Sequence, residues 1–303
     1  MREEALDRFK SNIAYPHMEK ALLKIFMDFY EQKENRREYY LKALKRVFLA
    51  VKKYTEDTGQ EIAYISFALL RTNFLYDKYV CDVHVYDKNW YFNDYMEICE
   101  MDTLDFFQPL EGIKSFLLSE SKKFVGKVNI SDVDNIISEY LLSFSQLFIK
   151  MFNYVLLEAT ECSEYAEIIK ADIFRIYIGE LHETHYNLHE ETKGRLSFSQ
   201  LANRIKYNEI CKNIDIRNSD FADKTLANAD LQYSDFRGSM LKNIDFSNAS
   251  LEGCIFANCS LVGANLSKAK ISEANFQNAD LRNANLSGIV SSEVIFEDED
   301  WDL

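Results

Sequence analysis

The stretch "FQNADLRNANLSG", residues 276–288, carries a large apolar side chain at every fifth position, at Phe276, Leu281 and Leu286. A small residue, Ala279 or Ala284, stands two places before a large one. An α-helix repeats its buried face about every 3.6 residues and a β-strand every second residue, so neither produces this spacing. The five-residue period predicts one large and one small inward side chain per repeat.

The same period runs without a slip through fifteen successive pentads, from Ile216 to Leu286. Asn or Gly dominates two places after each large residue, and both types accept the positive φ that a type II turn requires. A fixed short period indicates a solenoid, in which each unit buries its inner face only by stacking on its neighbours. The side chains of the predicted solenoid core are Phe221, Leu226, Leu231, Phe236, Leu241, Phe246, Leu251, Phe256, Leu261, Leu266, Ile271, Phe276, Leu281 and Leu286.

The repeat, roughly A-(D/N)-L-x-x, resembles that of the pentapeptide-repeat family over about residues 211–296 and is matched by "NADLQ", "GANLS", "EANFQ", "NADLR" and "NANLS". The resemblance implies a right-handed quadrilateral β-helix with four pentads to a coil. We expect the acidic tail "FEDEDWDL" to cap or leave this solenoid.

The sequence before the repeats follows a mainly helical pattern. Helices are predicted at about 132–157, with Ser131 as N-cap and Asp134 completing a variant capping box, at about 37–54, and from Pro16 onward. Runs rich in Ile, Val, Tyr and Phe predict a β-hairpin at about 62–86. The predicted fold class is therefore α+β with two domains: an α-rich N-terminal domain with a small β-hairpin (1–195), a connecting or capping segment (196–210), and the repeat β-helix with its acidic tail (211–303).

Composition narrows the class of protein. The chain has 303 residues, 47% of them apolar, and a net charge of −14, which argues against a general nucleic-acid binder. The six scattered cysteines form no C-x-x-C pair and indicate a reduced cytoplasmic protein. The charged start suggests no secretory signal, and the most apolar stretch is too interrupted to predict a membrane span.

Chemistry-bearing residues are few. "LHETHYNLHEE", residues 181–191, would place His182, His185 and His189 on one face if it were helical, and imidazoles four residues apart can share a zinc ion. The H-E-x-x-H motif is absent, and a solvated helix end explains the same residues. Cys254 and Cys259 both take the small inward position of the repeat and are explained as small buried residues. We therefore expect no cofactor and no catalytic residue.

The best-known pentapeptide-repeat proteins protect DNA gyrase by imitating duplex DNA with an acidic surface. Between residues 211 and 292 this chain carries nine acidic and eight basic residues, so the predicted rod is close to neutral, whereas a DNA mimic needs charge comparable to phosphate. We expect a non-enzymatic protein–protein interaction or scaffold protein whose partner is another protein. The alternatives are a DNA-mimicking type II topoisomerase binder and a metal-dependent enzyme in the N-terminal domain.

Overall fold

The computed structural model describes residues 2–89, 95–179, 185–193, 196–209, 211–292 and 294–295. The chain forms two compact units: Met1–Lys170 with Tyr177–Tyr186, and Ala171–Ile176 with Asn187–Leu303. The sequence predicted a division near residue 195, whereas the second unit also includes the strand residues 171–176 and 187–193.

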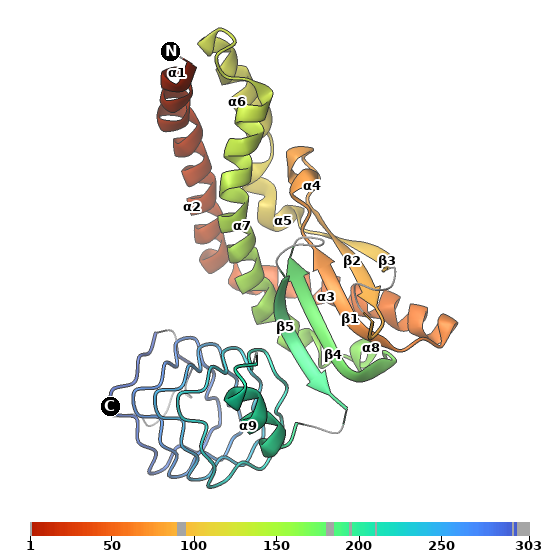
Figure 1. Cartoon of the computed structure of the whole chain (residues 1–303), viewed down its shortest axis with the longest axis vertical. Coiled ribbons are helices and arrows are strands. Elements are labelled where there is room, and N and C mark those ends of the chain that lie inside the picture. Colours follow the sequence, from red (N-terminus) through yellow and green to blue (C-terminus); the bar gives the residue numbers. More distant parts are fainter. Residues whose placement is uncertain are drawn as a thin grey trace. The chain divides into compact units, whose positions relative to one another are not determined.

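Helices make up most of the first unit (Figure 1). Their bounds are α1 (Arg2–Phe9), η1 (Lys10–Ala14), α2 (Tyr15–Glu31), α3 (Lys33–Thr58), α4 (Arg71–Leu75), α5 (Leu104–Phe107), η3 (Gln108–Leu110), α6 (Ile113–Ser121), η4 (Lys122–Phe124), α7 (Ile130–Ala159) and α8 (Ser163–Ala166). A π-helical turn, η1, separates α1 from α2, and Pro16 stands at the start of α2, as the sequence predicted. Proline lacks the N–H that a regular helix interior needs, so the wider turn before it accommodates the ring.

The central helix of this unit, α7, begins two residues earlier than predicted. Its N-cap is Asn129, whose side chain accepts a hydrogen bond from the Asp132 N–H at 3.0 Å, while the Asp132 carboxylate accepts one from the Asn129 N–H at 2.9 Å. The prediction of Ser131 as N-cap was therefore wrong, because Ser131 already lies in the first turn. By length and composition α7 is apolar enough to cross a membrane, and half of its most apolar window is buried inside the protein. The buried core helix of a folded domain passes the same test of length and composition.

The strands form one five-stranded sheet in the order β3-β2-β1-β4-β5. Their bounds are β1 (Ile62–Ala68), β2 (Val80–Tyr86), β3 (Met96–Asp102), β4 (Lys170–Gly179) and β5 (His185–Thr192). The predicted pair at 62–86 is confirmed: β1 and β2 are antiparallel, with Tyr64 opposite Tyr86. The short helix α4 lies between them in place of the expected turn, and β3, β4 and β5 were not predicted.

The second unit is dominated by a solenoid of stacked coils (Figure 1). Parallel bridges join residues twenty positions apart, such as Asp215 to Asp235 and Asp235 to Ile255, so each coil contains four pentads. The predicted core residues lie in one buried cluster, except Leu286, which is partly buried against it. Phe236, Phe256 and Phe276 stack from coil to coil with ring centroids 4.9 Å apart. These stacked side chains replace the sheet-on-sheet or helix-on-sheet layers of other folds.

The corners of the coils explain the Asn and Gly positions. Asn218 and Asn228 have φ values of 53° and 61°, and Gly253 has 65°. These values lie in the left-handed region, which costs least for glycine and asparagine. Gly253 has a second constraint, because a Cβ there would lie 2.3 Å from Cδ1 of Tyr233 in the preceding coil.

Helix α9 (Phe198–Lys206) covers the first coil of the solenoid. Ser197 and Gln200 form a capping box at its start. Leu201 is fully buried in the same cluster as the solenoid core, and the Phe198 ring stands edge-on to Phe221 with centroids 5.5 Å apart. The helix therefore buries apolar side chains that the first coil would otherwise expose. The predicted acidic tail at 296–303 lies outside the described residues.

Candidate functional site

The described part of the histidine-rich segment, residues 185–191, is not helical, and a helix was the condition for placing its histidines on one face. Residues 185–192 form strand β5, so the expected helical face of imidazoles was wrong. His182 lies outside the described residues, and His189 is buried with its Nε2 3.5 Å from the Glu191 carboxylate. Within the described ranges, no group of three His, Cys, Asp or Glu side chains is arranged to hold a metal ion.

Cys254 and Cys259 point into the solenoid and bond to the backbone of the preceding coil. The Cys254 thiol donates to the Leu231 carbonyl at 3.0 Å, and the Cys259 thiol donates to the Phe236 carbonyl at 2.8 Å. Burial raises the pKa of the Cys259 thiol to about 12. Because only the thiolate is a good nucleophile or metal ligand, these thiols are structural.

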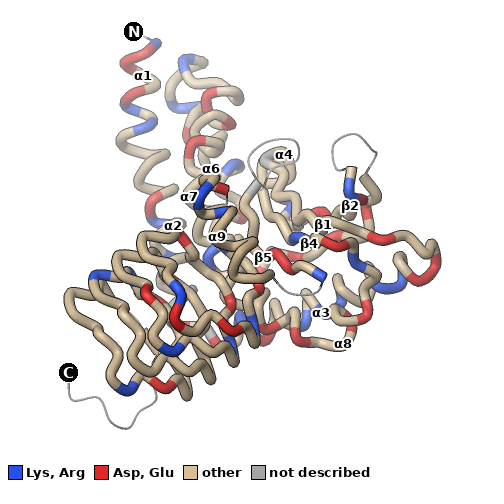
Figure 2. Tube along the Cα trace, turned by 60° about the horizontal axis from the view of Figure 1, so that its bottom comes forward, with Lys and Arg blue, Asp and Glu red and all other residues tan. Residues whose placement is uncertain are grey.

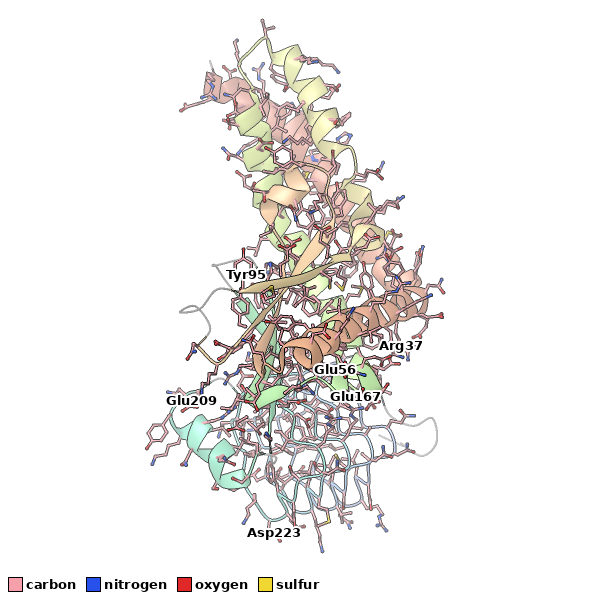
Figure 3. The ribbon with its side chains drawn as sticks, turned by 90° about the vertical axis from the view of Figure 1, so that its right-hand side faces the viewer. Arg37, Glu56, Tyr95, Glu167, Glu209 and Asp223 are labelled. Atoms are coloured by element: carbon pink, nitrogen blue, oxygen red, sulfur yellow. The ribbon has the colours of Figure 1, made fainter. Side chains whose placement is uncertain are left out.

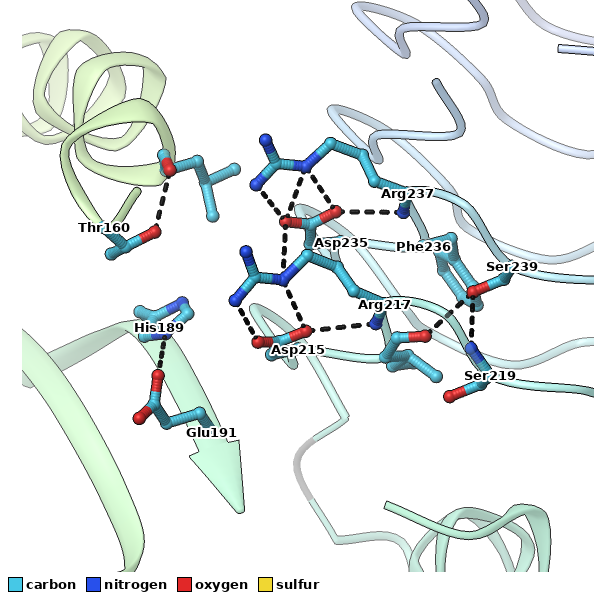
Figure 4. A network of polar contacts seen from close by, with 12 residues as sticks. Thr160, His189, Glu191, Asp215, Arg217, Ser219, Asp235, Phe236, Arg237 and Ser239 are labelled. Carbon is cyan, nitrogen blue, oxygen red and sulfur yellow. Dashed lines mark hydrogen bonds and ion pairs between the residues drawn. The ribbon is translucent and has the colours of Figure 1, made fainter. Parts of the chain in front are cut away.

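A ladder of alternating charges follows one side of the first two coils (Figure 4). Arg217 binds Asp215 through Nε at 3.0 Å and Nη2 at 2.6 Å, and Arg237 binds Asp235 in the same way. Arg217 also approaches the Asp235 carboxylate at 3.7 Å, which links the two coils. Asp235 is only 2% exposed. The carboxylates on this side are therefore neutralised by arginines of the solenoid itself.

The pKa values of Asp215 and Arg217 agree with this pairing. Burial alone would raise the pKa of Asp215, but the hydrogen bonds and positive charge of Arg217 outweigh it and hold that pKa below its ordinary value. The pKa of Arg217 is raised, chiefly by its hydrogen bond to Asp215. A small cavity of about 140 Å³ beside the pair is lined by Thr192, Asp215, Arg217 and Asn218. The charged groups beside this cavity are therefore already paired with one another.

Another side of the solenoid is polar but nearly uncharged. Asn285 donates to Asn265 at 3.2 Å, and Asn265 donates to Asp245 at 2.9 Å, so one amide column runs across three coils. A serine stands two residues after each of these three side chains. Its backbone N–H donates to the Asp or Asn side chain two positions earlier, at 3.0 to 3.2 Å; the serines are Ser247, Ser267 and Ser287. We call residues 245, 247, 265, 267, 285 and 287 the Asn–Ser face. The side chains at 245, 265 and 285 are held by hydrogen bonds, and all six residues are partly or fully accessible to solvent.

The remaining solenoid charges are mixed in sign, as Figure 2 shows along the turns. Lys212 pairs with Asp230 at 2.9 Å, and Arg282 pairs with Asp280 at 2.7 Å. Four of the acidic residues counted in the sequence, at 215, 230, 235 and 280, thus have a basic partner within the solenoid. A continuous acidic stripe is not formed by these residues.

A buried carboxylate at the start of the solenoid was missed by sequence reasoning. Glu190 of β5 is 4% exposed and binds Arg175 of β4 at 2.7 Å and Arg204 of α9. Its backbone N–H donates to the Asn213 carbonyl at 2.7 Å, and its own carbonyl accepts from the Asp215 N–H at 2.8 Å. β5 therefore supplies the first rung on which the coils stack. We call Glu190, Arg175 and Arg204 the clasp.

Helix α3 is rich in basic residues, and three of them, Arg36, Arg37 and Lys52, form ion pairs within the first unit. Arg37 makes a two-pronged contact with Glu158, at 2.8 and 2.7 Å. Lys52 pairs with Glu167 and lies 3.7 Å from Glu56. Figure 3 labels Arg37 and Glu56 on this helix and Glu167, which follows α8, beside it. These pairs fit the outer face of an amphipathic helix.

Comparison with known proteins supports the repeat assignment. Residues 229–302 match the family model described as a pentapeptide repeat region, so this part of the chain is a pentapeptide-repeat array. No functionally curated protein matches the chain.

Several solved structures resemble the array. HetL, a pentapeptide repeat protein involved in heterocyst differentiation regulation from the cyanobacterium Nostoc sp. strain PCC 7120, is 26% identical over 30% of this chain and 41% of its own, with a TM-score of 0.29. The pentapeptide repeat protein alr5209 from Nostoc PCC 7120 is 19% identical over 35% of this chain and all of its own, also at 0.29. QnrB1, a plasmid-mediated fluoroquinolone resistance protein, is 21% identical over 29% of this chain and 43% of its own, at 0.20.

Each of these similarities covers about a third of this chain or less. The chain spans less than half the length of HetL and of QnrB1. The similarities therefore extend to the repeat array and carry no functional argument for the whole protein.

Proposed function

We propose that this protein is a non-enzymatic interaction protein whose solenoid presents the Asn–Ser face to a protein partner. We further propose that the solenoid is the right-handed quadrilateral β-helix implied by its repeats, and that the protein acts in the cytoplasm. The observation that carries the proposal is the amide column from Asn285 through Asn265 to Asp245. Side chains already fixed by hydrogen bonds lose little conformational entropy when a partner binds, which favours association.

The spacing of this face also suits recognition of a protein. Successive coils lie about 4.8 Å apart, the distance between neighbouring strands of a sheet. An extended partner segment would therefore meet donors and acceptors at a regular interval, with Ser247 and Ser267 beside them. The buried, bonded thiols of Cys254 and Cys259 fit a structural and not a catalytic solenoid.

The alternative of topoisomerase binding by DNA mimicry receives no specific support. A mimic needs carboxylates that project like phosphates, but Asp215 and Asp235 are held by Arg217 and Arg237. The alternative of a metal-dependent enzyme loses its helical histidine face, because residues 185–192 form a strand.

The test is a nuclease-treated pull-down from the source cell with the full chain as bait, quantified by mass spectrometry. Ser267→Arg places a bulky charge on the Asn–Ser face. Ser272→Arg is the matched control, since it is the same substitution at the equivalent half-exposed position of the next pentad. A protein retained by the wild type and by Ser272→Arg but lost with Ser267→Arg supports the proposal.

Two outcomes contradict it. Equal recovery of every retained protein with both variants would show that the Asn–Ser face is not used. Recovery of topoisomerase subunits that survives Ser267→Arg would instead favour the mimicry alternative.

A further inference from the structure

A basic groove lies on the first unit, remote in sequence from the repeats. It has a volume of about 250 Å³ and is lined by Glu4, Ala5, Arg8, Lys123, Phe124, Val125 and Lys127. The lining residues come from α1 and from η4 with the loop after it. We call these residues the basic groove.

The charge of the groove is opposite to that of the protein. Three cationic side chains, Arg8, Lys123 and Lys127, face one carboxylate of the lining, Glu4, whereas the chain as a whole carries −14. Arg8 pairs with Glu4 at 2.8 Å, and Lys123 pairs with Glu120 at 2.7 Å. Within the described ranges no ion-pair partner of Lys127 is present. The groove therefore keeps the positive charge of Lys127, which an anionic ligand can neutralise.

One residue of the groove has an unusual backbone. Val125 has φ 50° and ψ 55°, the left-handed conformation, and it is 85% exposed. A β-branched residue rarely adopts this conformation, and strained backbone is often retained where it serves a function. A glycine or asparagine would adopt the backbone conformation of Val125 with less strain.

Packed residues on both sides of Val125 hold its side chain pointing outward. Phe124 stands edge-on to the fully buried Phe9, with ring centroids 5.4 Å apart, and Val128 is buried. The loop is thus anchored on both sides of Val125, and the valine side chain is held out at the rim of a cationic groove. An apolar group beside several cations can contact a ligand that combines acidic and apolar side chains.

We propose that the basic groove binds an acidic peptide segment of a partner protein. A carboxylate of the segment pairs with Lys127, others share Arg8 and Lys123 with Glu4 and Glu120, and one apolar side chain of the segment packs against Val125. A concave site with one exposed valine suits a peptide better than a membrane surface, which is bound through a larger apolar area. This interaction goes beyond the one proposed for the solenoid and uses a different surface.

The test is fluorescence anisotropy on the full chain with a labelled synthetic peptide of repeated Glu-Leu-Asp units. Lys127→Glu is expected to weaken binding by about tenfold, which corresponds to ~1.4 kcal/mol. Lys20→Glu is the matched control, since it makes the same charge change at an exposed position of α2 outside the groove, and it is expected to change binding by less than about twofold.

A second variant separates the apolar contact from charge. Val125→Asn introduces a residue that accepts the left-handed conformation more readily than valine, so the loop is preserved, and it is expected to weaken binding by about threefold. Rising salt should weaken binding by the wild type.

The proposal is overturned by any of four results. The wild type shows no saturable binding; Lys20→Glu loses as much as Lys127→Glu; a Gln-Leu-Asn version of the peptide binds equally well; or phosphatidylserine vesicles bind in a Lys127-dependent way while the peptide does not. Because the variants lie outside the solenoid, these results leave the Ser267→Arg experiment unaffected, and each proposal can fail alone.

Discussion

The clasp gives the sharpest test of how the solenoid is started. Glu190→Gln removes the buried charge but keeps the shape, and it leaves Arg175 and Arg204 facing a neutral amide. Removing one partner of a buried ion pair costs about 3–5 kcal/mol when the other charge stays buried. The two arginine side chains are 25% and 14% exposed, so solvent recovers part of this energy. We therefore expect a loss of about 2–4 kcal/mol in the stability of the first coils.

Hydrogen exchange measured by mass spectrometry can report this loss unit by unit. Amides of the first coils, such as those of Asp215 and Ile216, should exchange about 30- to 1,000-fold faster in Glu190→Gln, because each ~1.4 kcal/mol is a tenfold change in opening equilibrium. Amides of α7 in the first unit should keep their protection. Following both sets of amides avoids treating the whole chain as a single two-state transition.

Glu191→Gln is the matched control, because it is the same substitution one residue further along β5. Glu191 lies 3.5 Å from His189 and is more exposed than Glu190, so the expected loss is below about 1 kcal/mol. Equal protection losses in the two variants, or protection of the first coils unchanged in Glu190→Gln, would refute the inference that the clasp stabilises the first rung.

Three further predictions concern the coils. Gly253→Ala should destabilise the solenoid by about 2–4 kcal/mol. Adding Tyr233→Ala should recover the part of this loss that comes from the clash with the Tyr233 ring, but not the strain of about 1–2 kcal/mol from the left-handed backbone. A double-mutant cycle measured by urea unfolding would separate the two parts. The pKa of Asp215 is lowered in the fold, so the ionised carboxylate contributes to the free energy of unfolding above its ordinary pKa near 3.8, and this contribution is lost as the pH falls through the folded pKa. Asp215→Asn should therefore flatten this part of the curve of stability against pH. An unchanged curve would contradict the role given to Asp215. With a pKa raised to about 12, Cys259 should resist alkylation by iodoacetamide at pH 8 until the coils unfold, and rapid labelling of native protein, seen by peptide mass spectrometry, would contradict its burial.

The repeat could be predicted from the sequence because its cause is local. Each pentad needs a large inward residue, a small inward residue and a corner residue that accepts positive φ. The same sequence pattern therefore recurs in fifteen pentads. Chemical variation inside the pattern follows the same logic. Ser239 donates to the Ile216 carbonyl at 2.9 Å, as Cys259 does to that of Phe236, which shows why serine and cysteine share the small position.

The helices were predicted less completely because competing local signals were close in sequence. Asn129 and Ser131 are both good N-cap residues, and each has an aspartate three positions later. The structure uses Asn129, which lets α7 begin at Ile130. Strand β4 did carry a usable signal, since Phe174, Ile176 and Ile178 are buried at alternate positions, and that alternation could have identified it.

Strand β5 could not be predicted in the same way, because its conformation depends on tertiary pairing. Leu188 is the one aliphatic residue among His185–Thr192, so no alternation of apolar and polar residues marks a strand. Glu190 is held by the Asn213 carbonyl, by the Asp215 N–H and by two arginines distant in sequence. Hydrogen bonds and ion pairs of this kind override local propensity, and they turned a segment with helical histidine spacing into the first rung of the solenoid.

The two proposed surfaces would bind through different interactions, neutral hydrogen bonds on one and charge attraction on the other, and this difference affects how the protein would select its partners. On the Asn–Ser face the donors and acceptors of Asn265 and Asn285 are neutral, so recognition there depends on shape and hydrogen bonds and changes little with salt. In the basic groove Lys127 offers a charge with no ion-pair partner among the described residues, so binding there is expected to be faster and sensitive to salt. A carboxylate such as Asp235, buried and bound by arginine, contributes little to either kind of recognition. The net charge of −14 therefore describes the solubility of the protein better than its binding, and its specificity is expected to reside in the neutral face and the small cationic groove.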